Sequence, residues 1–160
     1  MNSKIKQIAR LSIVCAMYVV LTIVNPFSYD TVQFRISEIL MFLVFFKKDY
    51  AISLILGCLI ANLFSPMLLY DITFGTVATA LACLFMILSK NIFVSAIFPV
   101  LTNGIIVPLE LTLAFGTSYL LNVFWVVLGE AVVIAVGLII FNTLKNKPFF
   151  LELIGVEEKS

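Results

Sequence analysis

The sequence predicts an all-α integral membrane protein. Of its 160 residues, 62% are apolar and 12% are charged, and the mean hydropathy is +1.17. A soluble domain is nearer half apolar and a quarter charged, so the composition excludes an ordinary soluble class. Apolar runs separated by short polar breaks fill most of the chain. We therefore expect one transmembrane domain over residues 1–160, without a linker.

The first three apolar runs are residues 8–24, 35–46 and 50–64. The first resembles a signal peptide, but no small-x-small cleavage site follows it, and Asn25-Pro26 ends it. We therefore expect a retained helix. The second and third runs are shorter than the roughly 20 residues that a spanning helix needs. We expect them either to stand with little tilt under partly buried loops or to stop short of the full depth.

Three longer runs follow, at residues 71–89, 92–115 and 119–144, which makes six helices in all. Asp71 stands at the predicted start of the fourth helix, where the helix dipole favours a carboxylate. We interpret Asp71 first as the N-cap of that helix, with a role in ligand binding as the alternative.

Charge distribution predicts the orientation. With six spans both termini lie on one side, which carries nine of the ten basic residues, while Arg35 lies on the other. By the positive-inside rule the nine-residue side is cytoplasmic. The nine are Lys4, Lys6, Arg10, Lys47, Lys48, Lys90, Lys145, Lys147 and Lys159.

Polar side chains within the predicted spans gather toward the outer face. A charge at the bilayer centre costs about 2.5–3.5 kcal/mol on insertion scales, so Glu110 and Glu130 suggest a function. The alternative interpretation is that these two acids pair with each other inside the protein, or that each is protonated and hydrogen-bonded. Arg35 and Glu38 are three residues apart, so on a helix they share a face and can bind one ligand. A salt bridge that fixes a loop would give the same pattern.

Amides and aromatic residues accompany these acids. Asn62 and Asn103 lie on the third and fifth helices, and Phe34 and Trp125 lie at outer-half depth. An interfacial aromatic belt explains such rings equally well. Together, carboxylates, amides and rings suit a planar heterocycle with several N–H donors, since a carboxylate accepts two parallel N–H bonds and a ring covers the π-face. We expect a polar pocket that opens outward above an apolar floor.

Small residues at helical spacing form a stripe on the first helix, made of Ala9, Ser12 and Ala16. Such stripes let membrane helices approach closely. This stripe is the best candidate for contact with another membrane subunit. Similar pairs on later helices, such as Gly57 and Ala61, suggest internal packing.

The sequence predicts no cofactor and no metal site. It contains no histidine, and its three cysteines lie singly in different apolar runs. It also lacks a GxxxxGK[ST] phosphate loop. If the protein transports against a gradient, a partner must supply the energy. Nothing indicates a nucleic-acid partner.

Several blocks together resemble the QueT family of queuosine-precursor transporters. The similarity runs in order over about residues 5–145. It is carried by Val32-Gln33-Phe34-Arg35-Ile36-Ser37-Glu38, residues 57–63, residues 71–79, Asn103 through Leu111, and Leu128-Gly129-Glu130-Ala131. The blocks together are specific to this family, whereas any one block alone would be weak evidence for the resemblance.

The resemblance implies the substrate-binding (S) component of an energy-coupling factor (ECF) importer in a bacterial plasma membrane. It implies six helices, cytoplasmic termini, and an outer pocket covered by the loop between helices 1 and 2. It also implies a transmembrane coupling (T) subunit and two ABC-type ATPases as partners, with the S component toppling to release cargo. The small-residue stripe on helix 1 matches the docking surface of such proteins loosely.

The implied cargo is a 7-deazaguanine, most specifically the 7-aminomethyl form, preQ1. We expect Glu110 or Glu130 to bind the guanine-like edge, while the other acid, or Glu38 or Asp71, faces the ammonium. Asn62 and Asn103 would serve the carbonyl and the remaining nitrogens, and Phe34 or Trp125 would stack on the ring.

Other functions stay open at this stage. An ECF S component could carry another vitamin or nucleobase. A membrane-embedded enzyme could use the outer carboxylates as acid and base, although no nucleophile is evident. A channel is a third possibility, but the inner halves lack a polar file that would line a pore.

Overall fold

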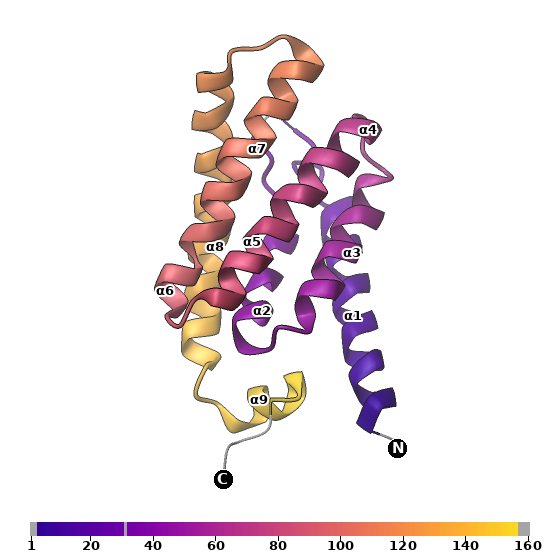
Figure 1. The fold of residues 1–160 in the computed structure, drawn as a ribbon, viewed down its shortest axis with the longest axis vertical. Helices are drawn as coiled ribbons and strands as arrows, with labels where there is room; N and C mark the ends of the chain where they lie inside the picture. The colour runs from indigo at the N-terminus through magenta and orange to yellow at the C-terminus, as the bar shows by residue number, and fades with distance from the viewer. Residues whose placement is uncertain (1–2, 31, 157–160) are drawn as a thin grey trace.

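The structure is a computed structural model that describes residues 3–30 and 32–156, and it is a bundle of long helices (Figure 1). The described helical elements begin with α1 (Ser3–Val24), the 3-10 helix η1 (Ile36–Met41), α2 (Phe42–Phe46) and α3 (Tyr50–Asn62). They continue with α4 (Leu68–Tyr70), the π-helical turn η2 (Asp71–Gly75), α5 (Thr76–Leu88), α6 (Ile92–Ser95), α7 (Ile97–Phe115), α8 (Tyr119–Leu144) and α9 (Pro148–Ile154).

Four of the described helical stretches are long and apolar enough to cross a membrane. Two shorter apolar stretches, Ile36–Phe46 and Tyr50–Asn62, correspond to the short second and third runs of the sequence. The all-α membrane class is therefore confirmed, while six spans remain a prediction. The four long stretches are Lys4–Val24, Leu68–Leu88, Ile92–Phe115 and Tyr119–Leu144.

Two element boundaries differ from the expected ones in ways that matter. The stretch expected as one helix over residues 35–46 begins as 3-10 helix (Ile36–Met41), and only its last five residues form α2. The fourth stretch begins at Leu68 rather than at Asp71, so Asp71 lies one turn inside it. The polar residues of these two segments therefore lie on 3-10 or π-helical turns rather than on regular α-helix.

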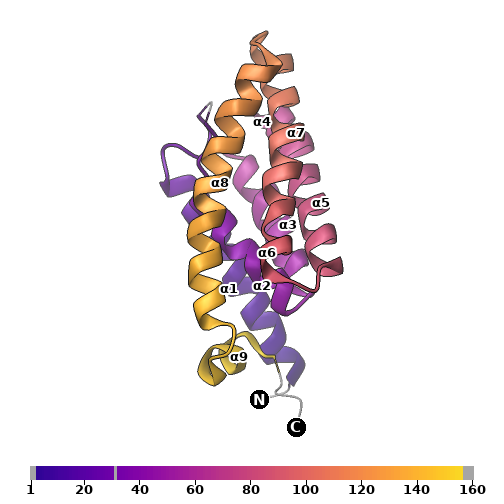
Figure 2. The ribbon, with the colours of Figure 1, turned by 90° about the vertical axis from the view of Figure 1, so that its left-hand side faces the viewer.

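The helices assemble as two neighbouring groups. α7 and α8 form an antiparallel hairpin whose connecting turn extends past the other elements, as Figures 1 and 2 both show. α1 packs along α3, and Gly57 of α3 allows this close approach. A Cβ on Gly57 would lie 2.9 Å from the Tyr18 Cβ and 3.1 Å from the Cys15 carbonyl oxygen. The prediction that Gly57 serves internal packing agrees with this contact.

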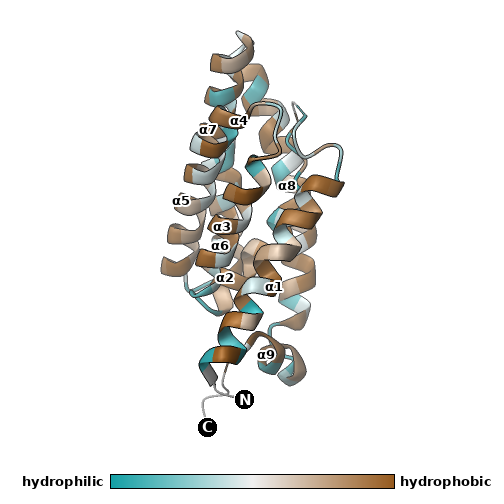
Figure 3. Cartoon of the chain, turned by 90° about the vertical axis from the view of Figure 1, so that its right-hand side faces the viewer, coloured by the Kyte–Doolittle hydropathy of each residue, from teal (hydrophilic) through white to brown (hydrophobic). Residues whose placement is uncertain are grey.

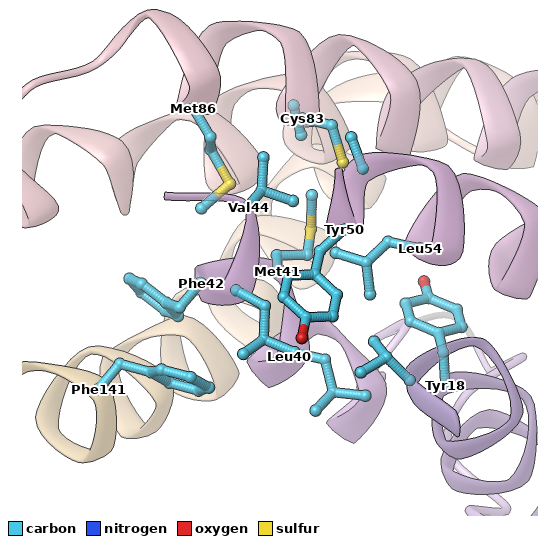
Figure 4. Packing of buried hydrophobic residues seen from close by; sticks show 14 of the residues in the cluster. Tyr18, Leu40, Met41, Phe42, Val44, Tyr50, Leu54, Cys83, Met86 and Phe141 are labelled. Atoms are coloured by element: carbon cyan, nitrogen blue, oxygen red, sulfur yellow. The ribbon is translucent and has the colours of Figure 1, made fainter. Parts of the chain in front are cut away.

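A hydrophobic core fills the half of the bundle where α1 begins and α8 ends. Figure 4 shows Met41 and Phe42 at its centre, surrounded by Leu54, Met86 and Phe141. Met41, Phe42, Leu54 and Met86 are fully buried. Phe42 stacks on Phe141 with ring centroids 5.6 Å apart. This core supplies the apolar floor that the sequence predicts.

The short helix α9 was not predicted, and it closes this end of the bundle. Phe150 and Ile154 are buried, and the hydroxyl of Tyr50 donates to the Ile154 carbonyl at 2.9 Å. The Lys47 ammonium donates to the Gly155 carbonyl at 2.8 Å, and the Arg10 guanidinium to the Glu152 carbonyl at 3.0 Å. These cations satisfy carbonyls that the end of a helix leaves free, so α9 links α1 to α3.

Replacing Gly57 with valine should destabilise the protein by about 1–3 kcal/mol, because added methyl groups overpack the contact between α1 and α3. Thermal unfolding in detergent measures the effect. Leu56→Val on the exposed side of the same helix is the matched control. Equal unfolding temperatures for the two variants would contradict the close packing.

Candidate ligand site

Buried acids and a buried arginine meet in the half of the bundle where α1 ends. Among the described residues, the buried acids are Glu38, Asp71, Glu110 and Glu130, each at most 2% exposed, and Arg35 is 5% exposed. The Arg35 guanidinium lies within electrostatic range of all four carboxyl groups. In Figure 3 the helices are mostly brown (hydrophobic) along their length, with teal (hydrophilic) residues among them and at their ends.

Arg35 forms an ion pair with Asp71. Its Nη2 donates to Asp71 Oδ1 at 2.7 Å, and its Nε donates to the Ser28 carbonyl at 3.1 Å. The second Asp71 oxygen accepts a hydrogen bond from the Ser65 hydroxyl. The interpretation of Asp71 as a helix N-cap is therefore wrong, because the residue lies within the fourth stretch and its carboxylate binds Arg35. Glu38 is likewise not the partner of Arg35 in a salt bridge.

The π-helical turn η2 brings Asp71 to this position. A π turn frees backbone groups from the regular helical pattern, and Asn62 Nδ2 donates to the Asp71 carbonyl at 2.7 Å. Gly75 closes the turn beside this contact, and a Cβ there would lie 3.0 Å from Asn62 Nδ2. Asn62 thus supports the turn from α3, while its own Oδ1 has no hydrogen-bond partner in the described structure.

The loop between α1 and η1 lies over these groups and is held at several points. Asn25 Nδ2 donates to the Phe34 carbonyl, and the Tyr29 hydroxyl donates to the Ala61 carbonyl at 2.6 Å. The Val32 carbonyl lies so close to Gly129 of α8 that no Cβ would fit there. The Arg35 guanidinium also lies 5.9 Å from the centre of the Tyr29 ring, within the range of a cation–π contact.

Glu38 and Glu130 each have one identified partner. The Tyr18 hydroxyl donates to Glu38 Oε1 at 2.6 Å, and Asn103 Nδ2 donates to Glu130 Oε1 at 3.1 Å. The two carboxyl groups are close enough to repel each other. Glu38 Oε2 has no hydrogen-bond partner in the described part of the chain.

Glu110 is the least satisfied of the four acids. Both of its carboxyl oxygens are buried and lack a hydrogen-bond partner among the described residues. Its carboxyl lies within hydrogen-bonding reach of the Asp71 carboxyl, a contact that needs a proton on one of the two groups, and Asp71 is itself engaged by Arg35 and Ser65. A buried carboxylate that receives no donor from the described residues is costly, so Glu110 is positioned to accept donors from a group that is not part of the chain.

The charge balance of the cluster also favours a ligand that brings hydrogen-bond donors. Four ionised carboxylates would place four negative charges against the single positive charge of Arg35. Such an excess is unfavourable in a buried site unless protons or donor groups neutralise it. The arrangement is therefore suited to a ligand with several N–H donors, or with a cationic group.

The structure brings together most of the predicted site residues but not all of them. Arg35, Glu38, Asn62, Asp71, Asn103, Glu110 and Glu130 are buried and connected by the contacts above. Phe34 is half-buried in the loop. Trp125 is 37% exposed, and its ring packs edge-on against Phe124 with centroids 5.1 Å apart.

Gln33 is a buried residue of this region that was not among the predicted site residues. It is 3% exposed, and its φ of 51° places a residue other than glycine in the left-handed region. Both amide atoms lack hydrogen-bond partners in the described structure. Its position in a loop next to Arg35 was the available sequence signal, but sequence alone does not show which loop side chains are buried.

The predicted docking stripe lies on the surface of α1. Ala9, Ser12 and Ala16 are exposed. Ser12 and Ala16 line a groove of about 460 Å³ between α1 and α3, together with Cys15, Leu56 and Ile60. Among the described residues, no cluster of His, Cys, Asp and Glu has the arrangement of a metal site.

Comparison with known proteins assigns the chain to a family. The family model described as QueT transporter matches residues 8–146. The chain belongs to the QueT transporter family. The Queuosine precursor transporter QueT of Lactococcus lactis subsp. cremoris (strain MG1363) is 31% identical over 164 residues, which cover 91% of this chain and 96% of that relative. No solved structure matches the chain.

Membership of the QueT transporter family confirms the family resemblance that the sequence shows. It identifies the chain as a multi-pass membrane transport protein rather than an enzyme. The unsatisfied acids are therefore candidates for binding transported cargo.

Breaking the Arg35–Asp71 pair should destabilise the protein strongly. Arg35→Met leaves Asp71 buried without its cation, and such changes cost about 3–5 kcal/mol. The double variant Arg35→Met with Asp71→Leu removes both charges and should recover most of this loss. Chemical unfolding in detergent measures both variants. If the double variant were no more stable than the single one, the pair would not be the reason for the loss.

Proposed function

We propose that this chain is the substrate-binding S component of an ECF-type importer and binds a 7-deazaguanine precursor of queuosine. The observation that carries the proposal is the group of buried, incompletely paired acids around Arg35, in a chain of the QueT transporter family. The name of the Lactococcus relative, a queuosine precursor transporter, supports the class of cargo.

The chemistry of the ligand fits the unsatisfied groups. A deazaguanine presents adjacent N–H donors at N1 and at the 2-amino group, which one carboxylate accepts together. Neither oxygen of Glu110 accepts a hydrogen bond from a described residue, so this carboxyl is our candidate for the contact. The 7-aminomethyl form, preQ1, adds an ammonium that a second carboxylate would neutralise, a role that we assign to Glu38 or Glu130, whose charges act on each other. A cationic cargo also reduces the excess negative charge of the cluster.

The proposed topology has six spans in a bacterial plasma membrane, with both termini in the cytoplasm. The described start of α1 and the helix α9 lie at the same end of the bundle (Figure 2), which supports this arrangement. The loop between α1 and η1 would then cover the site from outside. Labelling of single cysteines with an impermeant reagent tests the topology, since Tyr29→Cys should react in whole cells and Lys145→Cys should not.

The proposed partners are a transmembrane coupling subunit and two ABC-type ATPases. The exposed stripe of Ala9, Ser12 and Ala16, beside the groove between α1 and α3, offers a smooth apolar surface that another membrane helix can approach closely.

The direct test is the identity of the bound molecule. Gentle purification followed by mass spectrometry should release a 7-deazaguanine, and calorimetry should show saturable binding of preQ1. Binding of an unrelated vitamin in place of deazaguanines would overturn the proposed cargo but keep the class of transporter.

Replacing Glu130 with glutamine should weaken preQ1 binding at least tenfold, because the amide loses the charge and one acceptor oxygen. Isothermal calorimetry gives the dissociation constant. Glu152→Gln on the exposed face of α9 makes the same chemical change away from the cluster and should leave affinity unchanged. An unchanged constant for Glu130→Gln would remove that residue from the site.

Replacing Ala16 with tryptophan should block assembly with the coupling subunit and preserve ligand binding, because a large ring fills the groove without touching the acid cluster. Copurification with the coupling subunit and the ATPases reports assembly. Val136→Trp, on an exposed position of α8, is the matched control. Normal assembly of the Ala16 variant would place the partner on another face.

A further inference from the structure

Gln33 has an unusual combination of properties for a loop residue. Its side chain is 3% exposed, yet neither the amide nitrogen nor the amide oxygen has a hydrogen-bond partner in the described structure. Its backbone also adopts a φ of 51°, which is unfavourable for residues other than glycine, asparagine and aspartate. The fold thus keeps a buried, unsatisfied amide on a strained backbone, and neither feature stabilises the protein.

The contacts of Val32 and Arg35 locate the loop backbone on either side of Gln33. On one side, the Val32 carbonyl packs against Gly129, the residue before Glu130 of α8. On the other side, Arg35 is fixed to Asp71 of η2 at 2.7 Å. The loop therefore crosses from α8 to η2 at Gln33, between the two elements that contribute Glu130 and Asp71 to the acid cluster.

We infer that Gln33 is a specificity-determining residue that binds the heterocycle directly from the covering loop. This inference rests on the proposed function. A carboxamide offers one donor and one acceptor side by side, which matches a ligand edge where a ring acceptor stands next to an N–H. Ionised carboxylates can only accept, and the Asn62 and Asn103 amide nitrogens already donate to the Asp71 carbonyl and to Glu130. Gln33 adds a donor that is not engaged by a described residue.

The inference explains why the unsatisfied amide is retained. Without ligand, two buried polar atoms have no partner among the described residues, and the backbone is strained. With ligand, the heterocycle satisfies both atoms, so part of the binding free energy comes from groups that are unfavourable in the free protein.

Gln33→Met provides the decisive test, because methionine has a similar shape and meets the same backbone conformation but has no amide. We expect preQ1 binding at least tenfold weaker by calorimetry, with an unfolding temperature of the ligand-free protein equal to or above that of the wild type. Gln33→Asn keeps an amide and tolerates positive φ, so its affinity should lie between the two. The single tryptophan of the chain, Trp125, reports unfolding by its fluorescence.

The outcomes separate this inference from the proposed function. If the wild type does not bind preQ1 or another deazaguanine, the proposed function fails. If the wild type binds and Gln33→Met binds within twofold of it, Gln33 is not a ligand contact. If Gln33→Met loses affinity and ligand-free stability together, Gln33 supports the fold rather than the ligand, which would also overturn the inference.

Discussion

The ion pair between Arg35 and Asp71 is the contact on which the polar half of the protein depends. It joins the loop after α1 to a π-helical turn in the fourth helical stretch, and it places one cation among four acids. Buried ion pairs are weak evidence for stability, since desolvation offsets most of the attraction. Their value here is positional, because a guanidinium with donors to both Asp71 and the Ser28 carbonyl fixes the loop in one place.

One half of the bundle is an apolar core, and the other half holds the buried polar groups. The half closed by α9 has a dense apolar core, and its exposed ends are joined by hydrogen bonds to helix carbonyls. The other half contains the acids, the amides and their unsatisfied atoms. Residues that destabilise one region are tolerated where a well-packed region supplies the remaining stability, so the apolar half offsets the cost of the buried polar groups.

Composition and the cost of burying charge predicted the fold class and the grouping of polar residues near one end. Spacing along the chain did not predict the partners. Arg35 pairs with a residue 36 positions away, whereas three-residue spacing suggested Glu38. The predicted N-cap at Asp71 is wrong because the helix begins earlier, at Leu68, and the preceding Ser65-Pro66 does not indicate this start. The sequence does contain signals for the start and end of α9, because proline is common at the first position of a helix and glycine directly after its last position. Pro148 and Gly155 occupy these positions.

The unequal heights of the helices have a consequence for how the protein sits in lipid. With 26 residues, α8 is about 39 Å long, which exceeds a hydrocarbon layer of about 30 Å. The short helix α3, whose Ile52, Leu56 and Ile60 are exposed, reaches only about 20 Å. A molecule with one tall wall and one low wall must lean, or must thin the bilayer beside the low wall. Its resting angle in the membrane is then coupled to the acyl-chain length of the surrounding lipids.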